Sequence, residues 1–168
     1  MAEQAPPSAE DDLAETYRRH VDTIYGLCFL YLRNAADAED AVQSVFLKLL
    51  QAQKTFCDHG HERAWLIVTA KNHCRNVLKH WWRRRRADLR ELPLEADGNA
   101  GVPVSDALAS LLALPEKYKT VLYLHYFAGY TTRELACMLK RNESTIRTQL
   151  ARGRERLRID LEEDNNHE

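Results

Sequence analysis

The sequence predicts an all-α protein built from two small helical domains joined by a flexible linker. Apolar residues recur at helical spacing from Leu13 almost to the C-terminus, whereas no stretch shows the alternation typical of a strand. Residues 87–104 interrupt this periodicity with two glycines and two prolines among small and acidic residues. The 168 residues, 45% of them apolar, are enough to bury one or two compact cores.

These patterns divide the chain into five segments. An acidic, disordered N-terminus is expected over residues 1–12, and an acidic tail over residues 162–168. Between them lie a first helical domain (13–86), the linker (87–104) and a second helical domain (105–161). With only six glycines, five prolines and four cysteines, the composition excludes a collagen-like or disulfide-scaffold protein.

The first domain is expected to open with two helices separated by a stop at residues 34–37. Apolar residues from Tyr17 to Leu32 recur at helical intervals in the first of them. In the second, apolar residues from Ala38 to Leu50 follow the i, i+3, i+4, i+7 spacing of one buried face. The opposite face of this helix is polar, as expected either of a solvated surface or of a protein-docking site. It carries Asp37, Glu39, Asp40, Gln43, Ser44 and Lys48.

A third helix is expected to begin near Arg63, after a polar stretch over residues 55–62, and to carry a basic ridge. Its apolar stripe runs from Leu66 to Trp81. The ridge lies on another face, where like charges spaced by four repel by a few tenths of a kcal/mol per pair. An anionic partner would relieve this repulsion. The ridge consists of Lys71, Arg75, Lys79 and Arg83, with Asn72 and Asn76 beside it.

The net charge of −1 conceals a division between acidic ends and this basic segment. From Lys71 to Arg86 the chain carries seven cationic residues and no acid, and screening makes this local sum the relevant one. Aromatic planes beside a cationic surface are typical of proteins that bind single-stranded or unpaired bases. The aromatic residues in or beside the segment are Phe56, Trp65, Trp81 and Trp82. A solvated helix end with core tryptophans would share part of this pattern.

The second domain is expected to contain a helix-turn-helix. Two helices hinged at Pro115 precede Gly129, and a capping box at Thr131 starts a short helix that ends near Leu139. After a turn at residues 140–142, the last helix buries Ile146, Leu150 and Leu157. A helix of this kind fits the major groove of DNA, although an exposed helix hairpin in an ordinary bundle has a similar pattern. Its outward residues are Ser144, Thr145, Arg147, Thr148, Ala151 and Arg152.

The cysteines and histidines favour neither a disulfide framework nor a metal site. No CxxC pair is present, and we interpret Cys28, Cys74 and Cys137 as small core residues with reduced thiols. Residues 57–62 are rich in metal-ligand types, but no second cluster matches them except the nearby His73 and Cys74. We therefore expect no metal.

No catalytic motif is present either. The chain lacks a glycine-rich phosphate loop and a GxSxG sequence, so we expect no enzyme activity, no catalytic residue and no cofactor. No apolar run approaches the ~20 residues that span a bilayer. We therefore expect no direct membrane insertion and a cytoplasmic location.

The order of these parts resembles a bacterial sigma factor of the sigma-70 family, and most closely the extracytoplasmic-function (ECF) group, which keeps only sigma domains 2 and 4. The resemblance covers about Ala14 to Leu161. Two departures are Val68, where a basic residue is frequent, and Lys140, where related turns often use glycine. The matching segments are residues 37–46, Ala64-Trp65-Leu66, Ala70-Lys71-Asn72, Leu114-Pro115 with Val121-Leu122, 129–136 and 145–154.

The resemblance implies a role for each polar face. It implies that the protein docks on core RNA polymerase, through the β′ clamp helices and the β flap, and that it binds promoter DNA. It also implies an anti-sigma factor as a partner. The polymerase-docking residues it implies are Asp37, Glu39, Asp40, Gln43 and Ser44. Those implied for the minus-10 element are Phe56, His61, Arg63, Trp65, Lys71, Asn72, Arg75, Asn76 and Lys79. Those implied for the minus-35 element are Ser144, Thr145, Arg147, Thr148, Ala151 and Arg152.

Two other functions are compatible with parts of the sequence. A freestanding helix-turn-helix regulator would use the first domain for dimerisation or sensing, and it would not need the polar docking face at residues 37–46. A metal-binding sensor would use Cys57, His59, His61 and His73.

Overall fold

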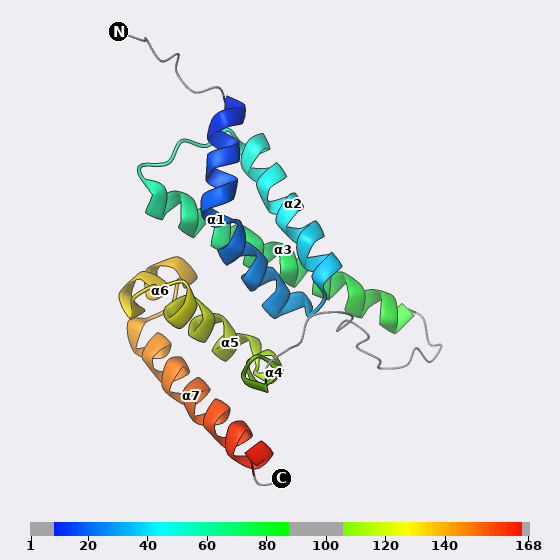
Figure 1. Ribbon diagram of the computed structural model, residues 1–168, viewed down its shortest axis with the longest axis vertical. Coiled ribbons are helices and arrows are strands. Elements are labelled where there is room, and N and C mark those ends of the chain that lie inside the picture. Colours follow the sequence, from blue (N-terminus) through cyan, green and yellow to red (C-terminus); the bar gives the residue numbers. More distant parts are fainter. Residues whose placement is uncertain (1–8, 88–105, 166–168) are drawn as a thin grey trace.

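The computed structural model of the protein describes residues 9–87 and 106–165, which are helical apart from short connections. In chain order the helices are α1 (Ala9–Leu32), α2 (Ala35–Ala52), α3 (His59–Ala87), α4 (Asp106–Ala113), α5 (Glu116–Leu122), the π-helix η1 (Tyr123–Phe127), α6 (Thr132–Leu139) and α7 (Glu143–Asn165). No strand occurs within these residues, which confirms the predicted all-α class. Figure 1 shows α1, α2 and α3 as one group and α4 to α7 as a second.

The first group packs around one core because each of its helices has a continuous apolar face. Ile24 and Leu27 of α1, Val45 of α2, and Leu66 and Ile67 of α3 are fully buried. Removing such side chains from water supplies most of the free energy that holds helices together. The core leaves the polar face of α2 and the basic face of α3 on the outside.

Side-chain caps determine where α2 and α3 begin. The Asn34 side chain accepts a hydrogen bond from the backbone N–H of Asp37 at 3.0 Å, which starts α2. The Asp58 carboxylate accepts one from the backbone N–H of His61 at 2.7 Å. As a result α3 begins at His59, and the expected start near Arg63 is wrong. Apolar periodicity cannot reveal a helix turn that has no apolar residue. The capping residue does mark the start of such a turn.

In the second group, the residues expected from the sequence to start and end α6 lie at its two ends. A capping box is present: Thr131 accepts from the Glu134 backbone at 3.2 Å, and the Glu134 carboxylate accepts from the Thr131 backbone at 2.8 Å. Gly129 before it has φ 77°, and Lys140 after α6 has φ 53°. Lys140 therefore adopts the left-handed conformation for which glycine is the usual residue.

The second group has its own core around α7. Leu124, Leu135 and Ile146 are fully buried there. Gly153 lets α7 approach α5 closely, because a Cβ at this position would lie 2.8 Å from Cδ1 of Leu122. Such a distance is too short for two carbon atoms in van der Waals contact.

The helices extend beyond the expected domain boundaries. Residues 9–12 belong to α1 and residues 162–165 to α7, although the sequence places them in a disordered N-terminus and an acidic tail. Ala87, expected to open the linker, is the last residue of α3. The remainder of the 87–104 linker lies outside the described residues.

Two expected core residues are exposed. Cys28 and Cys74 are buried as expected, but Cys137 is exposed on α6. Leu50 is 52% exposed even though it continues the apolar spacing of α2. It lines a groove whose walls come from α1 and α2, and no third helix within residues 9–87 and 106–165 lines this groove.

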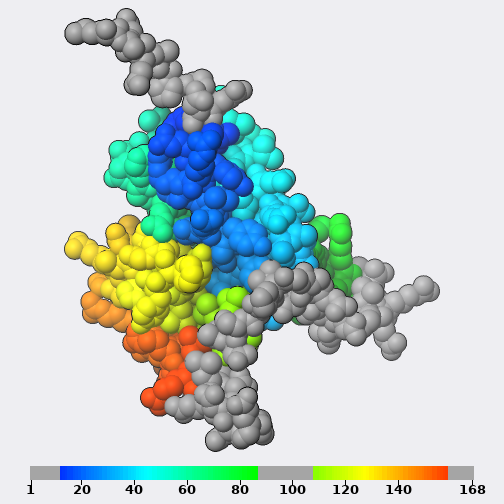
Figure 2. Space-filling view, viewed as in Figure 1, coloured from blue at the N-terminus to red at the C-terminus, as the bar shows by residue number. Residues whose placement is uncertain are grey.

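The two groups of helices pack against each other in the space-filling view (Figure 2). The Tyr31 hydroxyl at the end of α1 lies 2.7 Å from the Thr120 hydroxyl of α5. The Tyr123 hydroxyl of η1 donates to the Thr23 carbonyl of α1 at 3.0 Å. Arg33 donates to the Leu112 carbonyl. Within the described residues, no helix is long and apolar enough to cross a membrane.

Candidate nucleic-acid and polymerase interfaces

The exposed face of α3 carries most of the side chains that the sequence assigns to minus-10 DNA. His61, Asn72, Arg75, Asn76 and Lys79 are all exposed. They lie on one side of this 29-residue helix, with His61 near its start and the other four in its second half, and no residue from 62 to 71 between them is exposed. Cations here attract the DNA backbone, and the two asparagines supply donors and acceptors suited to base edges.

Aromatic rings gather at the start of this basic face. Phe56 meets the His61 ring edge-to-face at 5.3 Å between centroids and lies 6.0 Å from Trp65. The Lys54 ammonium lies 5.9 Å from the Trp65 ring centroid. This cluster offers stacking surfaces and a cation to an unstacked base. Trp82, further along α3, is 60% exposed.

A partly buried polar network fixes the start of α3 against α1, and sequence reasoning missed it. The Glu62 carboxylate lies 2.8 Å from the imidazole of His20, and it accepts from Thr16 at 3.3 Å and from Arg19 at 3.1 Å. Burial lowers the pKa of His20, although Glu62 raises it. The spacing Thr16, Arg19, His20 along one helix face is a signal, but only the structure shows that Glu62 lies opposite.

The same network also engages His59 of the histidine-rich segment. Arg19 lies 2.9 Å from the Nδ1 atom of His59 and also binds Glu62, so a cation already neutralises this carboxylate. No group of three or more His, Cys, Asp or Glu within the described part of the chain is arranged to hold a metal ion. His73 lies apart, 3.2 Å from the Lys48 ammonium.

Three of the residues assigned to minus-10 DNA face the second group of helices. Arg63 donates to the Ala128 carbonyl at 2.8 Å, and the Arg75 guanidinium pairs with Glu116 at 3.4 Å. Burial lowers the pKa of Lys71, and the nearby charges of Arg141 and Arg75 lower it further. The packing of the two groups therefore covers part of the basic face.

The polar face of α2 adjoins an apolar groove. Glu39, Asp40 and Gln43 are exposed, whereas Asp37 and Ser44 are partly covered. The neighbouring groove has a volume of about 630 Å³ and contains Leu47 and Leu50, which are 56% and 52% exposed. The apolar spacing of α2 placed Leu50 in the core, so the groove was not expected. The other residues that line it are Leu13, Ala14, Tyr17, Arg18, Gln43 and Phe46.

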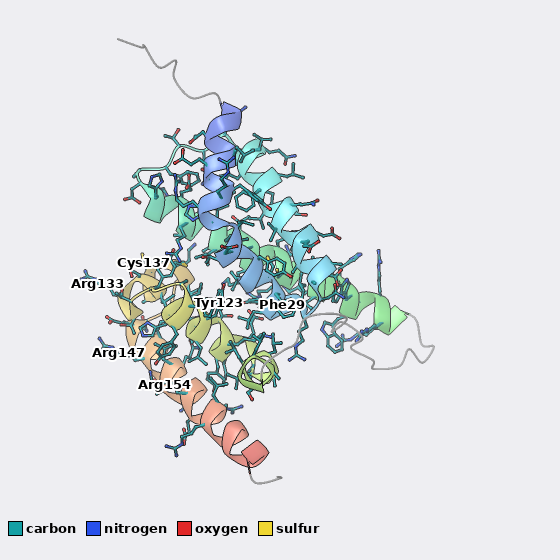
Figure 3. All side chains as sticks on the ribbon, in the orientation of Figure 1. Phe29, Tyr123, Arg133, Cys137, Arg147 and Arg154 are labelled. Atoms are coloured by element: carbon teal, nitrogen blue, oxygen red, sulfur yellow. The ribbon has the colours of Figure 1, made fainter. Side chains whose placement is uncertain are left out.

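The outward face of α7 matches the residues that the sequence assigns to minus-35 DNA. Ile146 and Leu150 are buried, and all six assigned residues are exposed: Ser144, Thr145, Arg147, Thr148, Ala151 and Arg152. Glu143 accepts from Arg147 at 2.7 Å and from Thr132 of α6 at 2.8 Å. These contacts hold the start of α7 against the preceding helix. In Figure 3, Arg147 points outward from α7.

An apolar cavity lies where the second group meets α1. It has a volume of about 270 Å³ and is lined by Phe29 of α1 and Tyr123 of η1, both labelled in Figure 3. Beside it Phe127 is 84% exposed and Tyr126 is 59% exposed. The cavity therefore continues into an exposed aromatic surface on the second group.

Comparison with protein families gives two matches that follow the two groups of helices. The family model described as sigma-70 region 2 matches residues 16–87, which span most of α1 through α3. The model described as sigma-70, region 4 matches residues 106–157, from α4 into α7. Together the two models cover more than half of the chain.

Curated relatives and solved structures agree with these matches. The ECF RNA polymerase sigma factor SigW of Bacillus subtilis is 28% identical over 94% of this chain and 93% of its own length. SigX of the same organism is 26% identical over 89% of this chain. The sigma factor RpoE from Bartonella quintana, solved with the anti-sigma factor NepR, has the same fold, with a TM-score of 0.73 and 16% identity over 90% of this chain and 97% of that one.

CnrH, solved with the cytosolic domain of CnrY, has a TM-score of 0.68 at 19% identity over 94% of this chain and 92% of that one. With both family models matched in order and ECF sigma factors similar along nearly the whole length, the chain belongs to the sigma-70 family of RNA polymerase sigma factors and to its extracytoplasmic-function group.

Proposed function

We propose that this sigma factor selects promoters by dividing two DNA elements between its two groups of helices. The first group reads and opens the minus-10 element through α3, and the second reads the minus-35 element through α7. The observation that carries this proposal is that each of the two sigma-70 regions has its own exposed face, on α3 and on α7, whose residue types suit DNA. As a sigma factor the chain directs promoter-specific transcription, and we assign all catalysis to the polymerase.

The minus-10 role rests on the combination of charge, amides and aromatic rings along α3. Unstacking a base costs a few kcal/mol, and each base stacked on an aromatic ring recovers ~1 to 3 kcal/mol. Phe56, His61 and Trp65 surround the point at which an extruded base would be received. Arg75 and Lys79 would hold the adjacent backbone, while Asn72 and Asn76 face the bases.

The minus-35 role rests on the exposed face of α7. A helix that presents Ser, Thr and Arg side chains fits the major groove, which is ~12 Å wide. Arg147 and Arg152 are suited to guanine acceptors, and Ala151 to a thymine methyl group. The contacts of Glu143 with Arg147 and Thr132 position the first turn of the helix.

Two surfaces are proposed to dock on core polymerase. Glu39, Asp40 and Gln43 form a polar rim beside the apolar groove that contains Leu47 and Leu50, which is the usual anatomy of a protein interface. We assign this surface to the β′ clamp helices. The exposed aromatic surface around Phe127 is assigned to the β flap.

The two groups of helices must separate for both elements to be bound. The element positions lie about 25 base pairs apart, which is about 85 Å of B-DNA at 3.4 Å per base pair. A compact chain of this size has a radius of gyration of only ~15 Å. In the packed arrangement Arg63 and Arg75 are also engaged by the second group. Separation therefore frees the minus-10 face and provides the span.

An anti-sigma factor is proposed as the partner that holds the chain inactive. The RpoE structure similar in fold to this chain was solved with the anti-sigma factor NepR. A partner that covers the apolar groove of α1 and α2 would exclude the polymerase from it. We place this regulation in the cytoplasm, where core polymerase and promoter DNA are found.

The melting role is tested with Asn72→Ala in the reconstituted holoenzyme. We expect Asn72→Ala to impair transcription from duplex promoters and to spare transcription from templates whose minus-10 region is already unpaired. Asp12→Ala, which changes an exposed residue of α1 outside the proposed minus-10 face, is the control and should affect neither template. Equal loss on both templates would contradict a role for Asn72 in opening.

A further inference from the structure

A polar cavity lies between the start of α5 and α7, beside the face that we assign to the minus-35 element. Its volume is about 250 Å³, and Lys117 and Tyr118 of α5 line it together with Thr145, Gln149 and Arg152 of α7. The expected minus-35 residues include no member of α5. The cavity therefore adds side chains from a second helix to the edge of the reading face.

Three cationic side chains surround Tyr118 beside this cavity. The Lys117 ammonium and the Arg156 guanidinium each lie 5.0 Å from the centroid of its ring. Although desolvation raises the pKa of the Tyr118 phenol, contacts with Lys117 and Arg152 and the charge of Arg156 lower it below its ordinary value. Within the described residues none of these three cations forms an ion pair with a carboxylate. Among the described residues, these three like charges beside one ring therefore lack a carboxylate partner, which favours an anionic ligand.

The position of the cluster indicates which anion this is. When α7 lies in the major groove, the walls of that groove are the two phosphate backbones. Lys117 projects from α5, which lies beside α7. Its ammonium would therefore lie near a phosphate backbone and not near the base edges. Lysine binds phosphate as a point charge, and arginine can do so with two parallel hydrogen bonds.

The other flank of α7 differs. Arg154 donates to the Tyr126 hydroxyl at 2.6 Å and is held against η1. Figure 3 shows Arg154 on α7, further along the helix than Arg147. Arg154 thus carries the same charge on the same helix but lies outside the cluster.

We propose that Lys117 and Arg156, positioned by Tyr118, bind the phosphate backbone of the promoter duplex beside the minus-35 element. This inference rests on the proposed function of α7. The site aligns the reading helix on the groove and carries no sequence preference of its own. Lys117 and Arg156 contact the ligand, whereas Tyr118 is a positioning residue.

The test measures binding of the reconstituted holoenzyme to a promoter duplex that it transcribes, between 50 and 200 mM salt. Each phosphate contact contributes about 0.9 to the slope of log affinity against log salt. Lys117→Gln combined with Arg156→Gln should therefore lower the slope by about 1.8. Between these two salt concentrations, the variant should lose about tenfold less affinity than the wild type. The preference for the correct over a scrambled minus-35 element should stay unchanged.

Three further variants separate positioning from charge. Arg154→Gln, the matched control, should leave the salt slope unchanged. Tyr118→Phe keeps the ring and removes the hydroxyl, so its slope should fall by less than that of the double variant. Tyr118→Leu removes the ring as well, and a wild-type slope in Tyr118→Leu would show that Tyr118 does not position Lys117 and Arg156.

A wild-type slope in the Lys117→Gln, Arg156→Gln variant would overturn the phosphate site while leaving promoter selection intact. If the variant instead lost its preference for the correct minus-35 element, these residues would be base-reading and the proposal would also be overturned. Failure of the wild-type chain to support any transcription with core polymerase would overturn the proposed function itself.

Discussion

Arg147 lies on the exposed face of α7 and is held near its start by Glu143 at 2.7 Å. We expect Arg147→Ala to reduce promoter use about fivefold to 150-fold, because a good contact between arginine and guanine is worth ~1 to 3 kcal/mol. The loss should be confined to promoters that carry the preferred base at one minus-35 position. Transcription from a set of promoters with each minus-35 base varied measures this. An equal loss across the whole set would show that Arg147 binds phosphate instead.

Lys119 is a buried cation on α5, where it faces Tyr31 and Arg33 of the first group. Burial and, to a smaller extent, the charge of Arg33 lower its pKa from 10.5 to about 8, although Glu116 raises it. Between these two pH values the unfolded chain binds more protons than the folded protein. The free energy of unfolding should therefore rise with pH from about 8 to 10.5 and be insensitive to this group below pH 8.

Lys119→Met keeps the buried stem and removes the titration. We expect wild type and variant to diverge with a slope of at most about 1.4 kcal/mol per pH unit in this window, measured by chemical denaturation. The other titrating groups that face Lys119, which are Tyr31 and Glu116, remain in both proteins. Parallel stability curves from pH 7 to 10 would show that Lys119 is solvated and not buried.

At the scale of the helix, the close approach of α7 to α5 depends on Gly153. Alanine is favoured over glycine inside a helix by ~1 kcal/mol, so propensity alone predicts that Gly153→Ala stabilises the protein. The added Cβ would lie 2.8 Å from Leu122 and 3.3 Å from Tyr118, and both belong to α5. We therefore expect a lower melting temperature for Gly153→Ala.

The combination of Gly153→Ala with Leu122→Ala serves as the control. Leu122→Ala removes the overlapping carbon, so the two changes together should cost less than the sum of their separate effects. A melting temperature of Gly153→Ala equal to or above the wild type would contradict the packing of α5 on α7.

The helices themselves were largely predictable, because the features that specify them are local. Thr131 and Glu134 form a capping box that predicts the start of α6 from the sequence, and Gly129 marks the preceding turn. The start of α3 was missed because Asp58 caps a first turn without apolar residues. The exposure of Leu50 was missed because spacing identifies an apolar face but does not show whether another helix covers it.

The candidate site was predictable only where side chains of one helix act together. The exposed faces of α3 and α7 follow from helical spacing: Asn72, Arg75, Asn76 and Lys79 of α3 are exposed, whereas Arg63, Trp65 and Lys71 are partly buried. The network of His20 with Glu62 joins two helices, and the contact of Tyr118 with Arg156 joins two more. Spacing along one helix contains no information about which residues of another helix lie opposite. The role of each face remains a prediction that the experiments above test.

At the scale of the whole molecule, the packing of the two groups of helices engages Arg63 and Arg75, which we assign to minus-10 DNA. Tyr123 donates to the Thr23 carbonyl, and a Cβ built at Gly26 would overlap the Tyr123 hydroxyl. We expect Gly26→Ala to push the second group away and to increase the radius of gyration in small-angle X-ray scattering. The change should also free Arg75 and raise the affinity of the chain for promoter DNA.

A second substitution tests whether the overlap is the cause. Tyr123→Phe in the Gly26→Ala background removes the overlapping oxygen, so the radius of gyration should return toward the wild-type value. The helix content by circular dichroism should stay constant in all three proteins, because alanine is compatible with the middle of α1. An unchanged radius of gyration in Gly26→Ala would contradict the packed arrangement in solution.

The most direct test of promoter selection is transcription in vitro from a promoter library with purified core RNA polymerase. We predict that RNA appears only when this chain is added, and that the active promoters share one minus-35 and one minus-10 sequence. A freestanding helix-turn-helix regulator would instead bind duplex DNA by itself and never support initiation with a cognate core enzyme. That second result would contradict the division of the promoter between α3 and α7.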